Sequence, residues 1–157
     1  MHFVQVKDQK MHFSSAHFVI GSDYCENLHG HNYMVEIFVQ APLDEHSMVI
    51  DFTKLKKDGR KICQSLDHKV LLPKHSTKIR ITTIEDSIEV RVEGKRYLIP
   101  SEDCIMLPIE ATTAELLAEY ISTKLEIPNA LRLRVCVEET PGSIACFERT
   151  HDKIGEK

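Results

Sequence analysis

Apolar and polar residues alternate along four stretches of the chain with the two-residue period of half-buried β-strands. The alternation is clear in residues 32–42 and 131–139 and shorter in residues 2–20 and 143–149. The first strand is long enough that we expect it to be continuous or bulged up to about Ile20. In residues 32–42 one face carries four apolar side chains, namely Tyr33, Val35, Ile37 and Val39. The other face is also partly apolar, which favours a sheet that packs on two sides or against another subunit.

Apolar residues spaced three or four apart predict two helices. The first is expected to run from about Thr53 to Leu66, and Gly59 should weaken its middle by about 1 kcal/mol relative to alanine. The second is expected to begin at the run TTAE, which fits a capping box with Thr112 as the N-cap, and to end near Leu125.

Between the two helices, residues 76–108 change character, because β-branched residues alternate there between turn signals. We expect an inserted meander of about three strands. We expect it to be a peripheral decoration without a part in the chemistry, and the alternative is an element that shapes a substrate pocket or a subunit contact. The whole order predicts an α+β fold, with an antiparallel sheet that carries two helices on one face. No repeat or linker divides the sequence, so we expect a single domain over residues 1–157.

Composition narrows the classes of function. The chain has 157 residues and a net charge of −4 with no basic block, so nucleic-acid binding has no electrostatic support. No apolar run approaches the roughly 18 residues that a membrane span needs, and the N-terminal residues lack a signal-peptide pattern. The five cysteines are odd in number and lack framework spacing. We therefore expect reduced thiols and a cytoplasmic protein.

One short window holds most of the candidate chemistry, namely His17, Cys25, His29 and His31. The two histidines of the HGH run would share one face of a strand, and His17 from a neighbouring strand could join them. Three imidazoles with an open position are typical of a catalytic zinc site. A structural zinc site would more often use CxxC pairs, which are absent here. Three-imidazole sites also accept other late transition metals.

Six motifs occur in a fixed order: FSSAH, C-x3-HGHNY, MVIDF, LDHKVL, TTAELLAEYI and VEETPGS. Together they resemble the 6-pyruvoyl-tetrahydropterin synthase / 6-carboxy-tetrahydropterin synthase family, over roughly residues 3–73 and 109–149. The resemblance implies a tunnelling fold that assembles into trimeric barrels stacked as a hexamer. The implied cofactor is Zn²⁺, and the implied substrate is 7,8-dihydroneopterin triphosphate.

The resemblance also implies a role for eight residues. The zinc ligands would be His17, His29 and His31, the catalytic residues Cys25, Asp67 and His68, and the pterin-binding residues Glu139 and Thr113. Nearby zinc would lower the pKa of a thiol such as Cys25, so that more of it is the thiolate that can accept a proton at neutral pH. Adjacent residues point apart on a strand, so the sequence leaves open whether Asp67 touches His68. The other cysteines are expected to be packing residues, namely Cys63, Cys104, Cys136 and Cys146.

Three residues separate Cys25 from His29, a spacing that resembles the branch of the family that makes 6-carboxy-5,6,7,8-tetrahydropterin, acetaldehyde and triphosphate. The alternative in the family is elimination of triphosphate to give 6-pyruvoyl-tetrahydropterin. Two alternatives fall outside catalysis. One is a pterin- or purine-binding zinc protein, and the other is a structural zinc domain, which would unfold when the metal is chelated.

Overall fold

The structure is a computed structural model that describes residues 1–21 and 27–150. Within these residues the chain forms two α-helices, nine β-strands and one short 3₁₀ helix (Ser101–Asp103). The elements in chain order are β1 (His2–His17), β2 (His29–Ala41), α1 (Phe52–Leu66), β3 (Lys69–Pro73), β4 (Arg80–Ile84), β5 (Ser87–Val92), β6 (Lys95–Pro100), β7 (Cys104–Leu107), α2 (Ala114–Thr123), β8 (Arg132–Thr140) and β9 (Ser143–Thr150).

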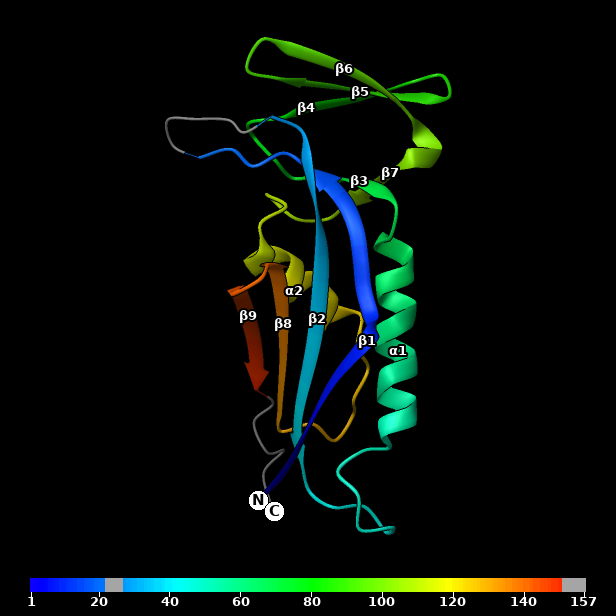
Figure 1. The fold of residues 1–157 in the computed structure, drawn as a ribbon, viewed down its shortest axis with the longest axis vertical. Helices are drawn as coiled ribbons and strands as arrows, with labels where there is room; N and C mark the ends of the chain where they lie inside the picture. Colours follow the sequence, from blue (N-terminus) through cyan, green and yellow to red (C-terminus); the bar gives the residue numbers. More distant parts are fainter. Residues whose placement is uncertain (22–26, 151–157) are drawn as a thin grey trace, which may run out of the picture.

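The main sheet has six strands in the order β7-β3-β1-β2-β8-β9 (Figure 1). The pairs β1–β2, β2–β8 and β8–β9 are antiparallel, as the sequence predicts. Strands β3 and β7 add two parallel pairings that the sequence analysis did not predict, so the sheet is mixed. Both strands are too short, at five and four residues, to show a clear apolar period. The predicted α+β class is confirmed, and β1 contains the expected irregularity in its pairing.

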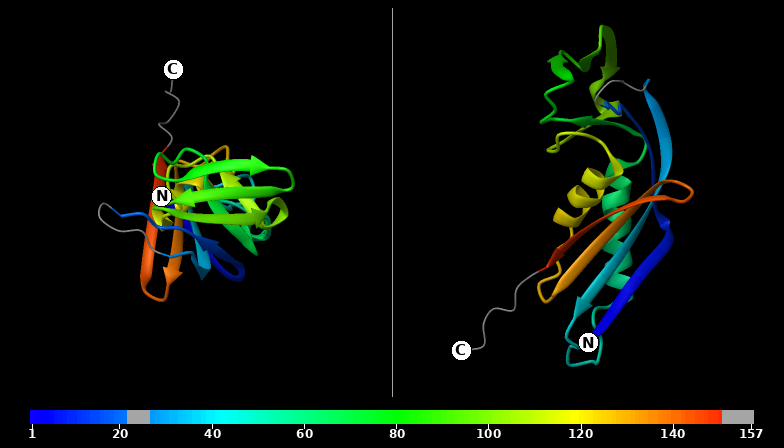
Figure 2. Two further views of the ribbon diagram at one scale, coloured as in Figure 1. Left: turned by 90° about the horizontal axis from the view of Figure 1, so that it is seen from above. Right: turned by 90° about the vertical axis from the view of Figure 1, so that its left-hand side faces the viewer.

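Both helices cover the same face of the main sheet (Figure 2). The four residues predicted to share the inner face of β2 are all fully buried there. The structure explains why a glycine stands at position 59 of α1. A Cβ at this position would lie only 3.0 Å from both Ile37 Cδ1 and Met11 Sδ. The helix can therefore approach β1 and β2 closely where it lacks a side chain. No helix among the described residues has the length and apolar character to cross a membrane.

The start of α2 differs from the prediction. Thr113 is the N-cap, and its side chain makes no capping hydrogen bond. Thr112 instead is buried, and its hydroxyl donates to the carbonyl of Phe18 over 3.2 Å. The predicted capping box with Thr112 as N-cap is therefore wrong, because a tertiary contact takes the hydroxyl that the helix end would otherwise use. The helix also ends at Thr123, one short turn before the predicted Leu125.

Where the sequence predicts a meander, strands β4, β5 and β6 form a separate three-stranded antiparallel sheet, which we call the inserted sheet. It lies beyond the ends of β1 and β2 (Figure 1). One face of β5 carries Ile88, Val90 and Val92 into a second apolar cluster, where they meet Phe18 and Leu72. The inserted sheet thus packs on the region that directly follows β1.

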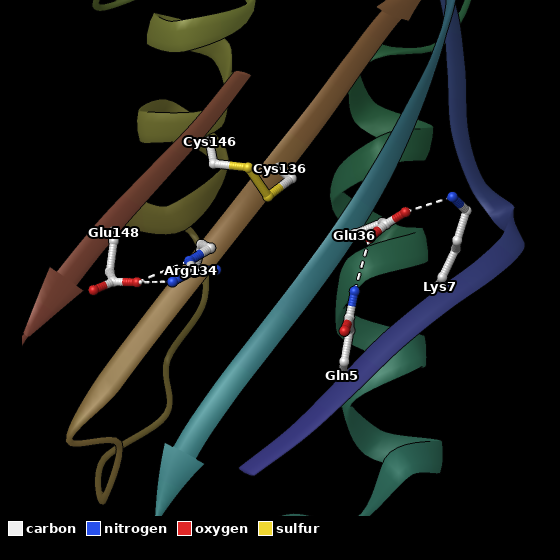
Figure 3. The surroundings of a disulfide bond; sticks show 7 residues. All are labelled: Gln5, Lys7, Glu36, Arg134, Cys136, Cys146 and Glu148. Carbon is white, nitrogen blue, oxygen red and sulfur yellow. Dashed lines mark hydrogen bonds and ion pairs between the residues drawn. A yellow bond between two sulfur atoms is a disulfide. The ribbon is translucent and has the colours of Figure 1, made fainter. Parts of the chain in front are cut away.

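The expectation that all cysteines are reduced packing residues is wrong for two of them. Cys136 and Cys146 face each other across β8 and β9 and form a disulfide, with their Cα atoms 4.0 Å apart (Figure 3). The sequence shows them only as two residues ten positions apart. The hairpin register brings them together. Of the other described cysteines, Cys63 is buried and Cys104 is partly buried, and both are free thiols.

We expect reduction of this disulfide to lower the free energy of unfolding by about 3 kcal/mol, because the bond closes a short loop in the unfolded chain. Urea unfolding with and without reductant measures the difference. The Cys146→Ser variant should show the lower value in both conditions, whereas Cys104→Ser should keep the wild-type response to reductant. A wild-type protein that is insensitive to reductant would show that the bond does not form in solution.

Candidate metal centre and adjoining hollow

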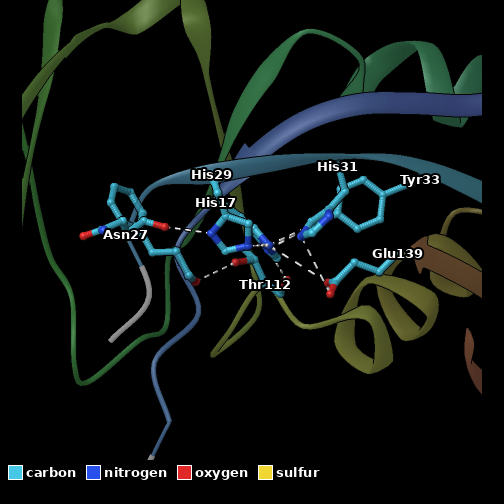
Figure 4. Close-up of polar contacts among 8 residues, drawn as sticks. His17, Asn27, His29, His31, Tyr33, Thr112 and Glu139 are labelled. Atoms are coloured by element: carbon cyan, nitrogen blue, oxygen red, sulfur yellow. Dashed lines mark hydrogen bonds and ion pairs between the residues drawn. The ribbon is translucent and has the colours of Figure 1, made fainter. Parts of the chain in front are cut away.

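The histidine cluster, His17, His29 and His31, is built by the pairing of two strands. His17 ends β1 and lies directly opposite His29, the first residue of β2. His31 follows two positions later on the same face, as the period of a strand requires. The three rings lie 4.7–5.2 Å apart between centroids (Figure 4). The sequence-based expectation that the three imidazoles share one face agrees with this geometry.

Backbone carbonyls orient two of the rings. The Nδ1 of His17 lies 2.8 Å from the carbonyl of Thr112, and the Nδ1 of His29 lies 2.7 Å from the carbonyl of Asn27 (Figure 4). A carbonyl can only accept, so each Nδ1 carries the proton and each Nε2 presents a lone pair. Metal-binding histidines commonly have this kind of partner on the second nitrogen. Sequence patterns could not reveal these partners, because both are backbone groups.

The donor set fits a metal ion. One ligand atom from each histidine lies within 4.8 Å of the others. The Nε2 atoms of His17 and His29 approach to 3.2 Å, although both offer lone pairs. The Nε2 of His31 is buried and has no hydrogen-bond partner. A cation bound by three imidazole nitrogens would satisfy these atoms, and zinc is the ion most often held in this way.

Glu139 lies beside the cluster, at the end of β8. Its carboxylate oxygens lie 3.7 Å from the Nε2 of His31 and 4.0 Å from the Nε2 of His17. The neighbouring Glu138 turns away, and its side chain accepts a hydrogen bond from the amide of Gly142 over 2.8 Å. The alternation of the strand therefore directs only Glu139 towards the histidines. The sequence alone could not distinguish these two adjacent carboxylates by their position on the strand.

An open hollow of about 470 Å³ adjoins the cluster, and we call it the Glu139 hollow. Thr113 and the first residues of α2 form one wall, and Glu139 with the β8–β9 turn forms another. The structure therefore brings Thr113 and Glu139 together beside the histidines.

Tyr33 is a further residue of the centre that sequence reasoning had assigned only to the core. Its hydroxyl lies 3.2 Å from the Nδ1 of His17 and 3.3 Å from its Nε2. Burial, with a smaller effect of the Glu139 carboxylate, raises the pKa of Tyr33 far above its usual value. The phenol therefore stays protonated and acts as a neutral hydrogen-bonding group next to the buried His17.

Asp67 and His68 follow α1 directly and contact each other. The Nδ1 of His68 lies 2.8 Å from the Asp67 carboxylate. Contact is possible because His68 has a left-handed backbone conformation (φ 56°), which breaks the alternation of a strand. The amide of Ser14 donates to Asp67 over 2.7 Å, and the amide of His68 donates to the carbonyl of Ser14 over 2.8 Å. The hydrogen bond from Ser14, helped by His68, lowers the pKa of Asp67 against the opposite effect of burial.

This Asp67–His68 dyad opens on a different hollow. His68 is 83% exposed at its side chain and lines a space of about 420 Å³ together with Ser14, Asn32 and Lys69. Asn32 alternates with His31 and Tyr33 along β2, so its side chain points to the opposite face. His31 also lines this hollow, whereas His17 and His29 do not, so the hollow of the dyad reaches the histidine cluster only at His31.

Cys25, the predicted catalytic thiol, lies outside the described residues. Neither free cysteine inside them suits that role. Burial raises the pKa of the Cys63 thiol to about 12, and burial also raises the pKa of Cys104. A thiol with a raised pKa is a poor source of thiolate at neutral pH.

Comparison with known proteins agrees with this architecture. Residues 7–150 match the family model of 6-pyruvoyl tetrahydropterin synthase. The putative 6-carboxy-5,6,7,8-tetrahydropterin synthase of Methanocaldococcus jannaschii is 35% identical over 147 residues, which cover 88% of this chain and 90% of the relative. The structure of 6-pyruvoyl tetrahydropterin synthase from Plasmodium vivax superimposes with a TM-score of 0.91 at 30% identity, over 96% of this chain and 98% of that one. A second P. vivax structure, described as a catalytic-residue mutant with glutamate replaced by alanine, has a TM-score of 0.88 at 28% identity over the same shares. The chain belongs to the 6-pyruvoyl tetrahydropterin synthase family.

Proposed function

We propose that this protein is a zinc-dependent lyase that converts 7,8-dihydroneopterin triphosphate and water into 6-carboxy-5,6,7,8-tetrahydropterin, acetaldehyde and triphosphate. The observation that carries the proposal is the histidine cluster, whose three Nε2 atoms converge beside a carboxylate and an open hollow. The name of the M. jannaschii relative supports the carboxy product. The product would serve the biosynthesis of 7-deazaguanine bases such as queuosine. We propose a cytoplasmic location, which the cysteines no longer support because Cys136 and Cys146 form a disulfide.

In this proposal His17, His29 and His31 hold the zinc ion. The ion supplies Lewis-acid polarisation of the hydroxyls on the substrate side chain, which makes the adjacent C–H bonds more acidic. Thr112 and Asn27 hold the imidazoles in orientation through their carbonyls. Glu139 binds the 2-amino-pyrimidinone edge of the pterin, because a carboxylate can accept two parallel hydrogen bonds from such an edge. Thr113 lines the same hollow.

Cys25 is the proposed base that removes a carbon-bound proton. Glu26, which follows Cys25 directly in the sequence, is a second candidate, because a carboxylate can also act as a general base. The P. vivax structure described as a catalytic-residue mutant, in which alanine replaces a glutamate, favours testing this second candidate. If both Cys25 and Glu26 can act as bases, each could favour a different product, the carboxy-pterin or the pyruvoyl-pterin.

We expect Cys25→Ala to reduce turnover by about 10²- to 10⁴-fold, the usual contribution of a general base. Zinc affinity and substrate affinity should stay near the wild-type values, because neither depends on the thiol. Glu26→Gln, measured in parallel, should retain most carboxy-product formation. If Cys25→Ala turns over normally while Glu26→Gln does not, the carboxylate is the base and the thiol is not.

We expect Glu139→Gln to weaken substrate binding by roughly 10- to 100-fold, since a hydrogen bond to a charged group contributes about 1.5–3 kcal/mol. Glu138→Gln is the matched control, because Glu138 contacts the β8–β9 turn and not the histidines. Fluorescence titration with the pterin measures the affinity. Unchanged affinity in Glu139→Gln would remove this residue from the pterin site, and a large loss of zinc affinity would make it a metal ligand.

The dyad completes the proposed site from a neighbouring subunit. The His68 side chain is 83% exposed in a hollow that shares no lining residue with the Glu139 hollow, so this imidazole is accessible to the site of a second copy. The uncovered face of the main sheet also exposes apolar side chains, among them Phe3, which is 62% exposed and lies 5.0 Å from Phe38 between ring centroids. Exposed apolar patches on a sheet favour association. We propose a homohexamer made of two trimers.

A product assay tests the proposed function. The zinc-loaded protein is incubated with 7,8-dihydroneopterin triphosphate, acetaldehyde is trapped, and the pterin products are identified by mass spectrometry. Carboxy-pterin with acetaldehyde is the expected result. Pyruvoyl-pterin without acetaldehyde would support the alternative that the name of the P. vivax protein suggests. Tight binding of the substrate without turnover would instead indicate a pterin-binding protein.

A further inference from the structure

The inserted sheet contacts both ends of the connection between β1 and β2. Before the connection, the ammonium group of Lys78 donates to the carbonyl of Gly21 over 3.3 Å. After it, the ammonium group of Lys95, the first residue of β6, donates to the side-chain oxygen of Asn27. Residues 22–26, which include Cys25, join these two ends. Lys95 of the inserted sheet and Lys78, which precedes β4 by two residues, therefore hold the two described flanks.

Apolar contacts reinforce both attachments. Ile20 and Leu28, one on each flank, pack against the second apolar cluster, which the inserted sheet largely supplies. Phe18 is almost fully buried there, and its ring meets the ring of Tyr97 of β6 edge to face, with centroids 5.1 Å apart. Exposed lysine contacts contribute little stability by themselves, so the apolar packing provides most of the attachment energy and the lysines define the geometry.

The turn between β5 and β6 determines where Lys95 lies. Its two central residues, Glu93 and Gly94, both have positive φ values, 45° and 78°. This is the geometry of a tight two-residue hairpin turn, which fixes the pairing of Val92 with Lys95. The hairpin turn therefore fixes the backbone position of Lys95, from which the flexible side chain reaches Asn27.

Asn27 connects this hairpin to the metal centre. Its side chain receives the hydrogen bond from Lys95, and its carbonyl receives the hydrogen bond from the Nδ1 of His29 (Figure 4). A shift of Asn27 would turn the imidazole of His29 and move its Nε2 away from His17. On the other flank, Phe18 directly follows His17 in the chain. The packing of Phe18 against Tyr97 therefore also restrains the backbone next to His17.

We infer that the inserted sheet is a positioning element of the metal centre. Through Lys95 and Asn27 it orients His29, and through Tyr97, together with Lys78 in the segment that leads into β4, it holds the chain on the other flank. This inference rests on the proposed function, because it takes the histidine cluster as a zinc site. Lys95, Lys78 and Tyr97 are positioning residues that touch neither the metal nor the substrate. In this inference the sheet acts on the metal centre by positioning, which differs from the expectation of a peripheral decoration.

The test measures zinc affinity by competition with a chromogenic chelator, and the visible absorption of the Co²⁺-loaded protein as a report on ligand geometry. For Lys78→Ala/Lys95→Ala we expect about tenfold weaker zinc binding and an altered Co²⁺ spectrum, because loss of outer-shell support typically costs about 10- to 100-fold. Lys95→Arg should restore both readouts, since arginine can still donate to Asn27. Lys57→Ala/Lys61→Ala, at exposed positions of α1, is the matched control.

A double-mutant cycle identifies the route. Lys95→Ala and Asn27→Ala should each weaken zinc binding, and the double variant should be no weaker than the more affected single variant, because both changes break one contact. Thermal unfolding of each apo variant checks that the fold persists, and the Lys95→Arg rescue separates positioning from general loss of stability. If wild type binds zinc and both lysine variants bind it equally well, the inference is overturned while the proposed function stands. If wild type binds no zinc, both are overturned.

Discussion

Replacing His29 with alanine is expected to weaken zinc binding by more than about 100-fold and to abolish turnover, since loss of an outer-shell partner alone costs up to about that much. His29 supplies one of three nitrogen ligands, and its Nε2 lies 3.2 Å from that of His17. Two imidazoles cannot complete the three-ligand arrangement of a catalytic zinc site. Competition with a chelator measures the affinity, and the product assay measures the turnover.

His46→Ala is the matched control for this variant, because His46 is 68% exposed at its side chain and lies in the turn before α1. It should bind zinc and turn over like wild type. Metal-free wild type should also remain folded at room temperature, since the main core is apolar and does not contain the histidines. Unfolding on chelation would instead support a structural zinc domain, and normal zinc binding by His29→Ala would remove the metal centre from this position.

Replacing His68 with alanine is expected to reduce turnover by about 10²- to 10⁴-fold while zinc binding is retained, the range that loss of an acid–base group usually gives. The contact between Asp67 and the Nδ1 of His68 leaves the Nε2 of His68 as the proton acceptor. The Asp67 carboxylate is ionised at neutral pH as an ordinary aspartate is, and the hydrogen bond from the amide of Ser14 lowers its pKa further. Steady-state kinetics and zinc titration of the purified variant measure the two quantities.

Mixing inactive variants shows whether the dyad serves a neighbouring chain. His29→Ala and His68→Ala subunits are unfolded together and reassembled in equal amounts. With random assembly, about a quarter of the sites should combine an intact histidine cluster with an intact partner dyad, and activity should return to that level. No recovery, in an assembly shown to contain both variants, would place the dyad and the histidines in one chain.

Long alternating stretches were predicted accurately because their period is intrinsic to the strand. The strand predicted at residues 32–42 corresponds to β2, and the helix predicted from Thr53 to Leu66 corresponds to α1 within one residue. The short strands β3 and β7 were not predicted, because four or five apolar residues do not distinguish a strand from a loop. Their parallel pairing with the sheet depends on the path of the whole chain.

In the candidate site, too, some features could be predicted from local sequence and others could not. Spacing within HGH and the two-residue period of a strand were enough to place His29 and His31 on one face. Other features depend on residues that are far apart in the sequence. The disulfide needs the register of β8 and β9, the orientation of His17 needs the carbonyl of Thr112, and the contact between Asp67 and His68 needs a left-handed residue.

By itself, the sequence determined the α+β class, the main antiparallel strands, both helices and the residues that resemble the family's metal centre. These follow from local periods and short motifs, which act over a few neighbouring residues. The family resemblance selected Glu139, but only the tertiary structure showed that its carboxylate lies beside the histidines. Only the tertiary structure also decided that Thr112 is used by the core and not by a helix cap, and that the inserted sheet reaches Asn27. Each of these features depends on side chains and backbone groups that come into contact only when distant segments pack. The local sequence pattern does not predict such contacts.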